Sequence, residues 1–82
     1  MAEKQIGVVS NYFEHVGVVA IKLKSGLKVG DMIRIVGGDT DLEQVVESMQ
    51  IHNKSIKEAK KGDDVGIKIS EKVRKGYKVY KL

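Results

Sequence analysis

The side chains able to do acid–base or metal chemistry are few in this 82-residue chain, and their spacing does not gather them. His15 and His52 are the only histidines, and cysteine is absent. A zinc site would have to recruit scattered carboxylates, so we expect no metal and no other cofactor. The serines show no nucleophile elbow; they are Ser10, Ser25, Ser48, Ser55 and Ser70.

Two aspartate pairs have the types needed for a general acid and base, but both lie in predicted turns. Asp39 and Asp41 follow a Gly-Gly dipeptide, and Asp63 and Asp64 follow Gly62. Aspartate in such turns caps the backbone and stays solvated, which gives its carboxyl no reason for a raised pKa. We therefore expect that the chain is not an enzyme.

Nucleotide-binding motifs are also missing from the sequence. Neither G-x-x-x-x-G-K-[ST] nor G-x-G-x-x-G occurs. Residues 53–56, Asn-Lys-Ser-Ile, begin like the guanine-specificity motif of GTPases but lack the aspartate two residues after the lysine. The sequence predicts no independent binding or hydrolysis of GTP.

Positive charge is concentrated in the second half of the chain. Residues 52–82 carry 10 basic and 4 acidic side chains, whereas residues 1–51 carry 5 and 7. A basic half is typical of a nucleic-acid surface, although lysines also keep strand edges soluble. On strand faces opposite the predicted core, the candidate RNA contacts are Lys22, Lys24, Arg34, Lys68 and Lys78.

Aromatic side chains supply the remaining candidates. Tyr80, flanked by Lys78 and Lys81, could stack on a base, or it packs on the exterior of the domain near the terminus. Tyr12 and Phe13 fall at a predicted hairpin tip, where aromatic side chains are typical anchors of a protein interface. Alternatively, these two residues cap one end of the core.

Composition indicates a single all-β domain spanning residues 1–82. The 20 β-branched aliphatic residues outnumber 4 leucines and 3 alanines, the reverse of a helical protein. Apolar runs are only a few residues long, and the polar start Met1–Lys4 does not predict a signal peptide. Without cysteine there is no disulfide framework, so we expect a cytoplasmic protein without membrane contact.

Alternation of apolar and polar residues predicts strands at 6–12, 15–24, 31–36, 64–69 and 77–82. Turn signals separate them at Ser25-Gly26, Gly30-Asp31, Gly37-Gly38, Gly62-Asp63 and Lys75-Gly76. The side chains predicted to face the core are Val19, Ile21, Leu23, Ile33, Ile35, Val65, Ile67, Ile69, Tyr77 and Val79.

One stretch in the middle of the chain fits both a helix and a strand. A helix would bury the stripe Leu42, Val45, Val46 and Met49. A strand would direct Val45, Met49 and Ile51 into the core and Val46 and Gln50 away from it. We predict the strand, on the resemblance described below.

A lysine followed by a Gly-Asp pair occurs twice, 32 residues apart, at 28–31 and 60–63. Glycine permits a positive φ, and the aspartate side chain can accept hydrogen bonds from nearby backbone amides. The two segments are therefore predicted to form the same turn, each delivering the chain into a strand.

Several stretches, in order and with matching spacing, resemble one known domain: 17–19, 26–37, 45–51, 59–67 and Gly76. The chain resembles the second domain of translation GTPases such as elongation factor Tu. Over residues 41–51 it is more similar to small stand-alone translation elongation factor-like proteins. It is also similar to the C-terminal barrel of collagenase-like peptidases.

The resemblance implies a small, closed, six-stranded antiparallel Greek-key barrel of the translation-protein type. This chain has Ala20-Ile21-Lys22 where those domains carry Thr-Gly-Arg. The GTPase domain with which that barrel holds aminoacyl-tRNA has no counterpart in the 82 residues, so that activity is not implied.

Two functional hypotheses follow. The first is a non-catalytic binding module that contacts ribosomal RNA, tRNA or a ribonucleoprotein through basic side chains. The second is a protein-interaction domain that docks on a separately encoded GTPase, peptidase or other partner, with the hairpin tip as its anchor.

Overall fold

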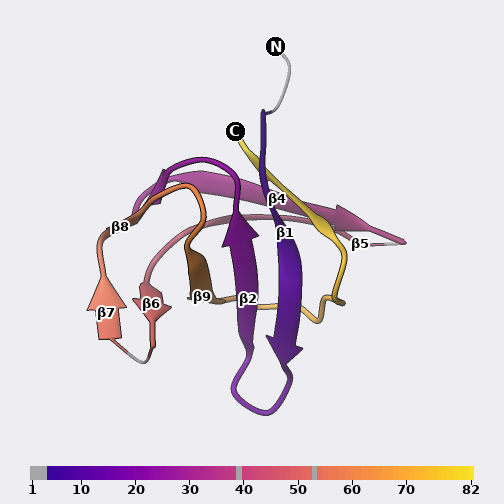
Figure 1. Cartoon of the computed structure of the whole chain (residues 1–82). Coiled ribbons are helices and arrows are strands. Elements are labelled where there is room, and N and C mark those ends of the chain that lie inside the picture. The colour runs from indigo at the N-terminus through magenta and orange to yellow at the C-terminus, as the bar shows by residue number, and fades with distance from the viewer. Residues whose placement is uncertain (1–3, 39, 53) are drawn as a thin grey trace.

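The computed structural model describes residues 4–38, 40–52 and 54–82, and these residues form strands, turns and loops without a helix (Figure 1). None of them supplies a helix long and apolar enough to cross a membrane. The strands are β1 (Lys4–Phe13), β2 (Val18–Leu23), β3 (Leu27–Lys28), β4 (Met32–Gly37), β5 (Thr40–Val45), β6 (Met49–Ile51), β7 (Lys54–Ile56), β8 (Glu58–Ala59), β9 (Asp64–Lys68) and β10 (Lys78–Lys81).

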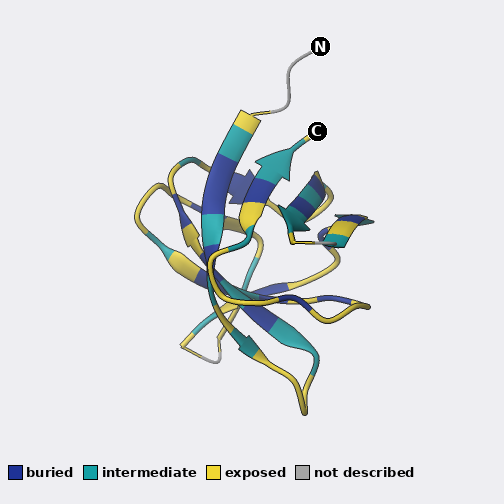
Figure 2. Cartoon of the chain, turned by 90° about the vertical axis from the view of Figure 1, so that its right-hand side faces the viewer, coloured by how far each residue is buried: buried dark blue, intermediate teal, exposed yellow. Residues whose placement is uncertain are grey.

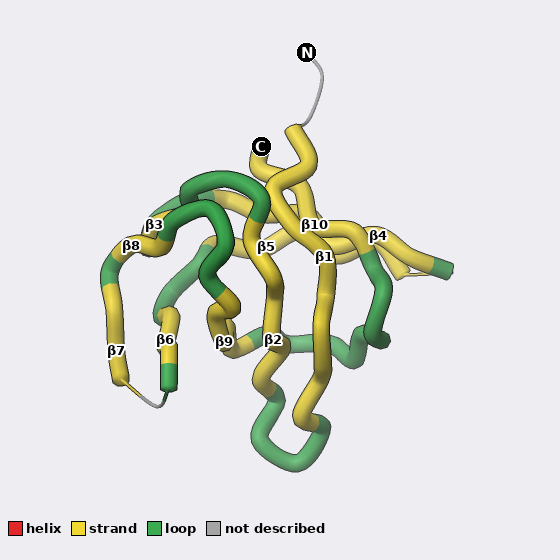
Figure 3. The backbone as a smooth tube through the Cα atoms, viewed as in Figure 1, coloured by secondary structure: helices red, strands yellow, loops and turns green. Residues whose placement is uncertain are grey.

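All described strand pairs are antiparallel, which confirms the predicted all-β class. The main sheet has eight strands in the order β5-β4-β10-β1-β2-β9-β6-β7, and β3 pairs with β8 in a second sheet of two strands. The main sheet bends around the core, as the tube view shows (Figure 3).

The predicted closed barrel of six strands is not what the structure contains. Among the described residues there are ten strands, and no backbone pairing joins the terminal strands β5 and β7. The count differs because four of the strands have only two or three residues. Closure differs because the chain at 46–48 leaves strand geometry, so the β6–β9 pairing does not continue toward β5.

The core is formed by alternate residues of the long strands, and exposed residues lie between them (Figure 2). Of the side chains predicted to face it from residues 15–24, 31–36, 64–69 and 77–82, all are buried except Tyr77, which is partly buried and packs against it. No polar or charged side chain among the described residues is buried. Further buried members are Ile6, Val9, Leu27, Leu42, Val46, Met49, Ala59 and Val73.

The middle of the chain is not helical, as predicted, but the predicted strand is interrupted at 46–48, and its predicted face is wrong at the most informative position. Val46 is 0% exposed and Val45 is 41% exposed, the reverse of the prediction. Met49 is buried, Ile51 is partly buried and Gln50 is exposed, as predicted. The inward alternation of Leu42 and Gln44 continues to Val46, and the phase changes between Val46 and Met49, where the chain is irregular and residues 47 and 48 are both exposed.

Both Gly-Asp turns form as predicted. Gly30 has φ 100° and Gly62 has φ 93°, a region that favours glycine. The carboxylate of Asp31 accepts a hydrogen bond of 3.0 Å from the Lys28 N–H. In the second turn, Asp63 accepts the equivalent bond of 2.9 Å from the Lys60 N–H. The strands that precede the turns pair with each other, with Leu27 opposite Ala59, so the two turns are related by an approximate two-fold axis.

Candidate binding surfaces

His15 lies apart from the other described acid–base candidates, whereas His52 lines the same surface hollow as Ser10, Asp63 and Asp64. His15 is exposed in the β1–β2 turn, and His52 is exposed at φ 51° after β6. Asp63 holds its turn, and Asp64 accepts a hydrogen bond of 3.1 Å from the Ser10 hydroxyl. Within residues 4–38, 40–52 and 54–82, no group of three His, Cys, Asp or Glu side chains could hold a metal ion. Asp39 and Asn53 lie outside the described residues.

Four of the six candidate RNA contacts share the outer face of neighbouring strands. Lys78 and Tyr80 alternate with the buried Val79 on β10, so both point away from the core. Arg34, opposite Tyr80 on β4, points outward between two buried isoleucines. Lys22 on β2 and Lys78 pair with the same residue of β1, Val8. We name Lys22, Arg34, Lys78 and Tyr80 the basic outer face.

The two remaining candidates lie at different distances from this face. Lys24 follows β2, and its N–H donates to the Ile6 carbonyl at 2.6 Å, which places it at the margin of the face. Lys68 ends β9 opposite Val18, four residues along β2 from Lys22. Because a strand rises about 3.3 Å per residue, Lys68 is about 13 Å from that part of the sheet and does not join the basic outer face.

Carboxylates interrupt the positive charge of the basic outer face. Arg34 Nε donates to Asp41 Oδ1 at 2.7 Å, and its Nη2 donates to Oδ2 of the same carboxylate. This hydrogen-bonded guanidinium holds the pKa of Asp41 below its usual value. Lys81, predicted to flank Tyr80, belongs to the other side of β10, where its Nζ lies 3.4 Å from Asp31. Among the described residues, Lys22 and Lys78 form no ion pair, although Asp64 lies directly opposite Lys22 on β9.

The β1–β2 hairpin tip separates the two aromatic candidates. Tyr12 is partly buried against the core, the alternative that the sequence left open. Phe13 is 42% exposed, and Val16, which the sequence analysis did not single out, is 52% exposed. Both border a hollow of about 450 Å³ over the outer faces of β2 and β9, whose floor includes Ala20 and Gly66. We name this hollow the hairpin trough.

An exposed ion pair lies at the same tip. Lys72 Nζ is 2.7 Å from Glu14 Oε1. The hydrogen bond and charge of Lys72 lower the pKa of Glu14, and Glu14 in turn raises the pKa of Lys72. The pair joins the tip to the loop that follows β9, next to the hairpin trough.

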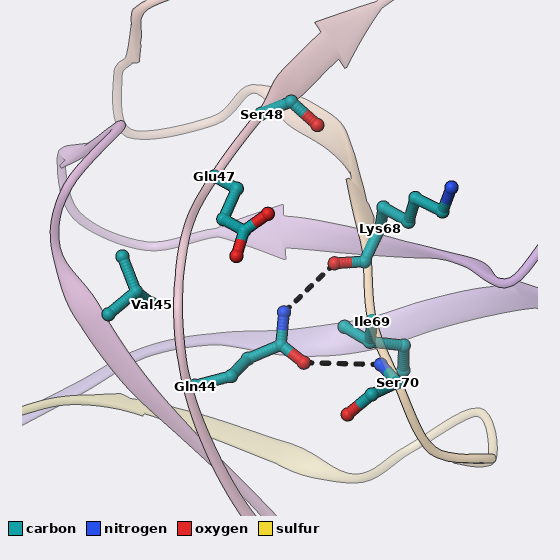
Figure 4. Close-up of a pocket in the computed structure, with 7 residues that line it drawn as sticks. All are labelled: Gln44, Val45, Glu47, Ser48, Lys68, Ile69 and Ser70. Carbon is teal, nitrogen blue, oxygen red and sulfur yellow. Dashed lines mark hydrogen bonds between the residues drawn. The ribbon is translucent and has the colours of Figure 1, made fainter.

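A third surface, not found from the sequence, lies between β5 and the end of β9 (Figure 4). The Gln44 side-chain Nε2 donates to the Lys68 carbonyl at 2.9 Å, and its Oε1 accepts from the Ser70 N–H at 3.2 Å. A cavity of about 330 Å³ adjoins this amide, bordered by Val45, Glu47 and Ile69 among others. We name it the seam.

The chain is a small all-β domain with three candidate binding surfaces, and among its described residues no group of three His, Cys, Asp or Glu side chains could hold a metal ion. No known protein family's sequence model matches the chain. It is 47% identical over 79 residues to an uncharacterised protease of Methanocaldococcus jannaschii, covering 95% of this chain and 19% of that protein. It is 35% identical over 79 residues to a collagenase of Porphyromonas gingivalis, covering 94% of this chain and 22% of the collagenase.

Solved structures show the same fold. The C-terminal domain of a putative U32 peptidase of Geobacillus thermoleovorans superposes with a TM-score of 0.89 at 17% identity, covering 96% of this chain and 92% of that one. Its selenomethionine variant gives a TM-score of 0.89 at 16% identity and covers 94% and 98%.

The chain is thus homologous to the C-terminal domain of collagenase and U32 peptidase proteins, which confirms that part of the predicted resemblance. It spans about a fifth of the length of the curated relatives it matches, so the similarity brings no peptidase activity to these 82 residues. The resemblance to translation-factor barrels stays a prediction.

Proposed function

We propose that the domain is a non-catalytic binding module that contacts RNA, alone or in a ribonucleoprotein, through the basic outer face. The observation that carries the proposal is the strand register, which brings Lys22, Lys78 and Tyr80 together from separate parts of the sequence. The predicted resemblance to translation-factor barrels is a second, weaker support.

The chemistry of the face suits a flexible, weakly selective RNA contact. Lys22 and Lys78 are one strand apart on either side of Val8, about 10 Å from each other at the backbone. Two such cations bind phosphates and release counterions, which makes affinity salt-dependent. Tyr80 offers a ring for stacking beside them. Ribosomal RNA and tRNA are the RNAs to test first.

The test is fluorescence anisotropy of labelled tRNA or ribosomal RNA fragments between about 50 and 200 mM salt, where phosphate contacts lose affinity steeply. Lys22→Glu with Lys78→Glu is expected to make the slope of log K against log salt shallower by about 2, one unit for each lysine. The matched control is Lys54→Glu with Lys57→Glu, which changes the net charge equally at exposed positions outside the face. Equal losses in both double variants, or no binding at low salt, would refute the proposal.

A second candidate function is docking on another protein through the hairpin trough. It is favoured by the exposure of Phe13 and Val16 beside a hollow floored by small residues. A pull-down from native lysate after nuclease treatment tests it. Retention of one defined protein by the unaltered chain but not by Phe13→Ser would support docking, and a loss of retained material on nuclease treatment would favour RNA.

A further inference from the structure

Gln44 makes a contact that imitates strand pairing. Its amide donates to the carbonyl of Lys68 and accepts from the N–H of Ser70, the two backbone groups that flank Ile69. A residue of a neighbouring strand pairs with the same two groups through its own N–H and C=O in a parallel ladder. A primary amide carries one of each, so the Gln44 side chain occupies the place of one residue of a missing strand.

The edge that Gln44 covers is left open by the backbone of the domain. On one side, the Ile69 N–H donates to the Gly17 carbonyl at 3.0 Å, beside β2. On the other side, the pairing of β9 with β6 ends at Ile67 opposite Met49. Beyond that point the chain runs irregularly through 46–48, so the described backbone offers Lys68 and Ser70 no strand. Backbone groups that no strand pairs, and that only a side chain covers, are a template for an added strand.

The borders of the seam indicate the charge of the occupant. Glu47 is exposed and borders the seam, whereas Glu43 lies directly opposite Arg34 on β4 and does not border it. In the close-up, the Glu47 carboxylate turns toward the gap and the Lys68 side chain runs away from Gln44 (Figure 4). The charge that faces the gap is therefore the carboxylate of Glu47, in a chain whose formal net charge is +4.

We propose that the seam binds an extended, basic segment of a partner protein by strand addition, a role distinct from RNA binding by the basic outer face. The segment's backbone takes over the hydrogen bonds to Lys68 and Ser70, and the Gln44 amide is displaced. An outward-pointing lysine or arginine side chain of the segment lies beside Glu47. Backbone bonds supply affinity in such complexes, and alternate side chains supply specificity.

The probe is a capped peptide, acetyl-Thr-Lys-Val-Lys-Thr-amide, whose two lysines point to one face of a strand. It is titrated into the 15N-labelled chain while amide signals are followed by NMR. We expect saturable shifts at the Ser70 N–H and at the Gln44 side-chain amide. The same peptide with its central N–H groups methylated is expected to bind about tenfold more weakly, as the loss of one or two hydrogen bonds implies.

Two variants and one control separate the seam from general charge attraction. Glu47→Lys is expected to weaken binding about fivefold or more, because it replaces an attractive charge beside the peptide with a repulsive one. Glu58→Lys, the same change at an exposed position of β8, is expected to leave binding unaltered. Gln44→Ala is expected to bind about threefold more tightly because the competing amide is gone.

Three results would overturn strand addition at the seam: no saturable shift at Ser70 with millimolar peptide, equal binding of the methylated peptide, or equal effects of Glu47→Lys and Glu58→Lys. Glu47 is exposed, so its variant stays informative even where Gln44→Ala fails to fold. Because RNA binding by the basic outer face is measured separately, failure of one proposal is distinguishable from failure of the other.

Discussion

The two Gly-Asp turns have the same local structure but hold different parts of the chain. In each, the glycine N–H donates to a buried strand-end residue, and that residue's N–H donates to the aspartate carbonyl. Gly30 and Asp31 hold Val46 in this way, at 2.9 and 2.8 Å. Gly62 and Asp63 hold Leu23 with the same two distances. We name Val46 and Leu23 the anchors.

The settings differ in the direction along the chain. The first turn holds an anchor that comes later, just after β5, and the second holds one that comes earlier, at the end of β2. Each turn is therefore hydrogen-bonded to the end of a strand that is distant in the sequence, the first turn to Val46 and the second to Leu23. Among the described residues, an ion pair is present at the first turn and none at the second: Lys81 Nζ lies 3.4 Å from Asp31, whose side chain is 11% exposed. Local sequence produces the turn, and tertiary contact determines what it holds.

The largest expected effect comes from removing the anchors. Val46→Ser is expected to lower the free energy of unfolding by about 2 kcal/mol, and Leu23→Ala by about 3 kcal/mol, because both side chains are buried. Val45→Ser, at the exposed neighbour, is expected to change it by about 0.5 kcal/mol or less. Chemical denaturation midpoints measure all three. A larger loss for Val45→Ser than for Val46→Ser would contradict the observed register.

The anchors also show where prediction from sequence stops. Alternation and turn residues are local signals, and they were sufficient for the buried faces of β2, β4 and β9 and for both turns. Val46 continues the inward alternation of Leu42 and Gln44, and the phase changes only at the exposed residues 47 and 48. No local pattern reports this break, or the hydrogen bonds by which Gly30 and Asp31 hold the Val46 backbone. The expected barrel closure also depends on contacts that are distant in the sequence. Across the seam, β5 is joined to the end of β9 by the Gln44 side chain and not by backbone pairing.

The candidate surfaces were likewise predicted where local sequence decides them and missed where contacts between distant residues decide them. Lys22, Lys78 and Tyr80 could be placed outside because each alternates with a buried neighbour, but their grouping depends on the order of strands in the sheet. Lys68 has the same local pattern and lies elsewhere. Gln44 gave no signal at all, because a glutamine in a strand is ordinary until its cross-sheet partners are known.

Alanine at the turn glycines tests whether the two turns are conformationally equal. Gly30→Ala and Gly62→Ala each place a side chain at a positive φ near 100°, and a Cβ at either position meets no atom within 4 Å. The cost is then conformational alone, about 1–2 kcal/mol for each. The free energies of unfolding of the two variants are measured by thermal or denaturant unfolding. If their losses differ by more than about 1 kcal/mol, the contacts around each turn alter the conformation of the turn itself.

Replacing the aspartates measures how much the Lys81 ion pair adds to the stability of the first turn. Asp31→Ala removes the bond to the Lys28 N–H and the partner of Lys81 from a nearly buried position, and we expect a loss of about 1.5 kcal/mol. Asp63→Ala removes only the bond to the Lys60 N–H, with an expected loss of about 1 kcal/mol. Unfolding midpoints of the two variants should keep this order. The reverse order would mean that the ion pair adds nothing to the first turn.

Lys81→Met isolates the ion pair and gives the smallest expected effect. The methionine keeps most of the apolar stem of the lysine, so the change removes mainly the charge next to Asp31. The Lys81 side chain is 41% exposed, and exposed pairs contribute little, so we expect a loss of about 0.5 kcal/mol or less that shrinks as salt is raised. The double variant Lys81→Met with Asp31→Ala should then lose no more than Asp31→Ala alone, because the pair is already broken. Additive losses in this double-mutant cycle would show that Lys81 stabilises the chain through a contact other than Asp31, and the two turns would then differ only in their anchors.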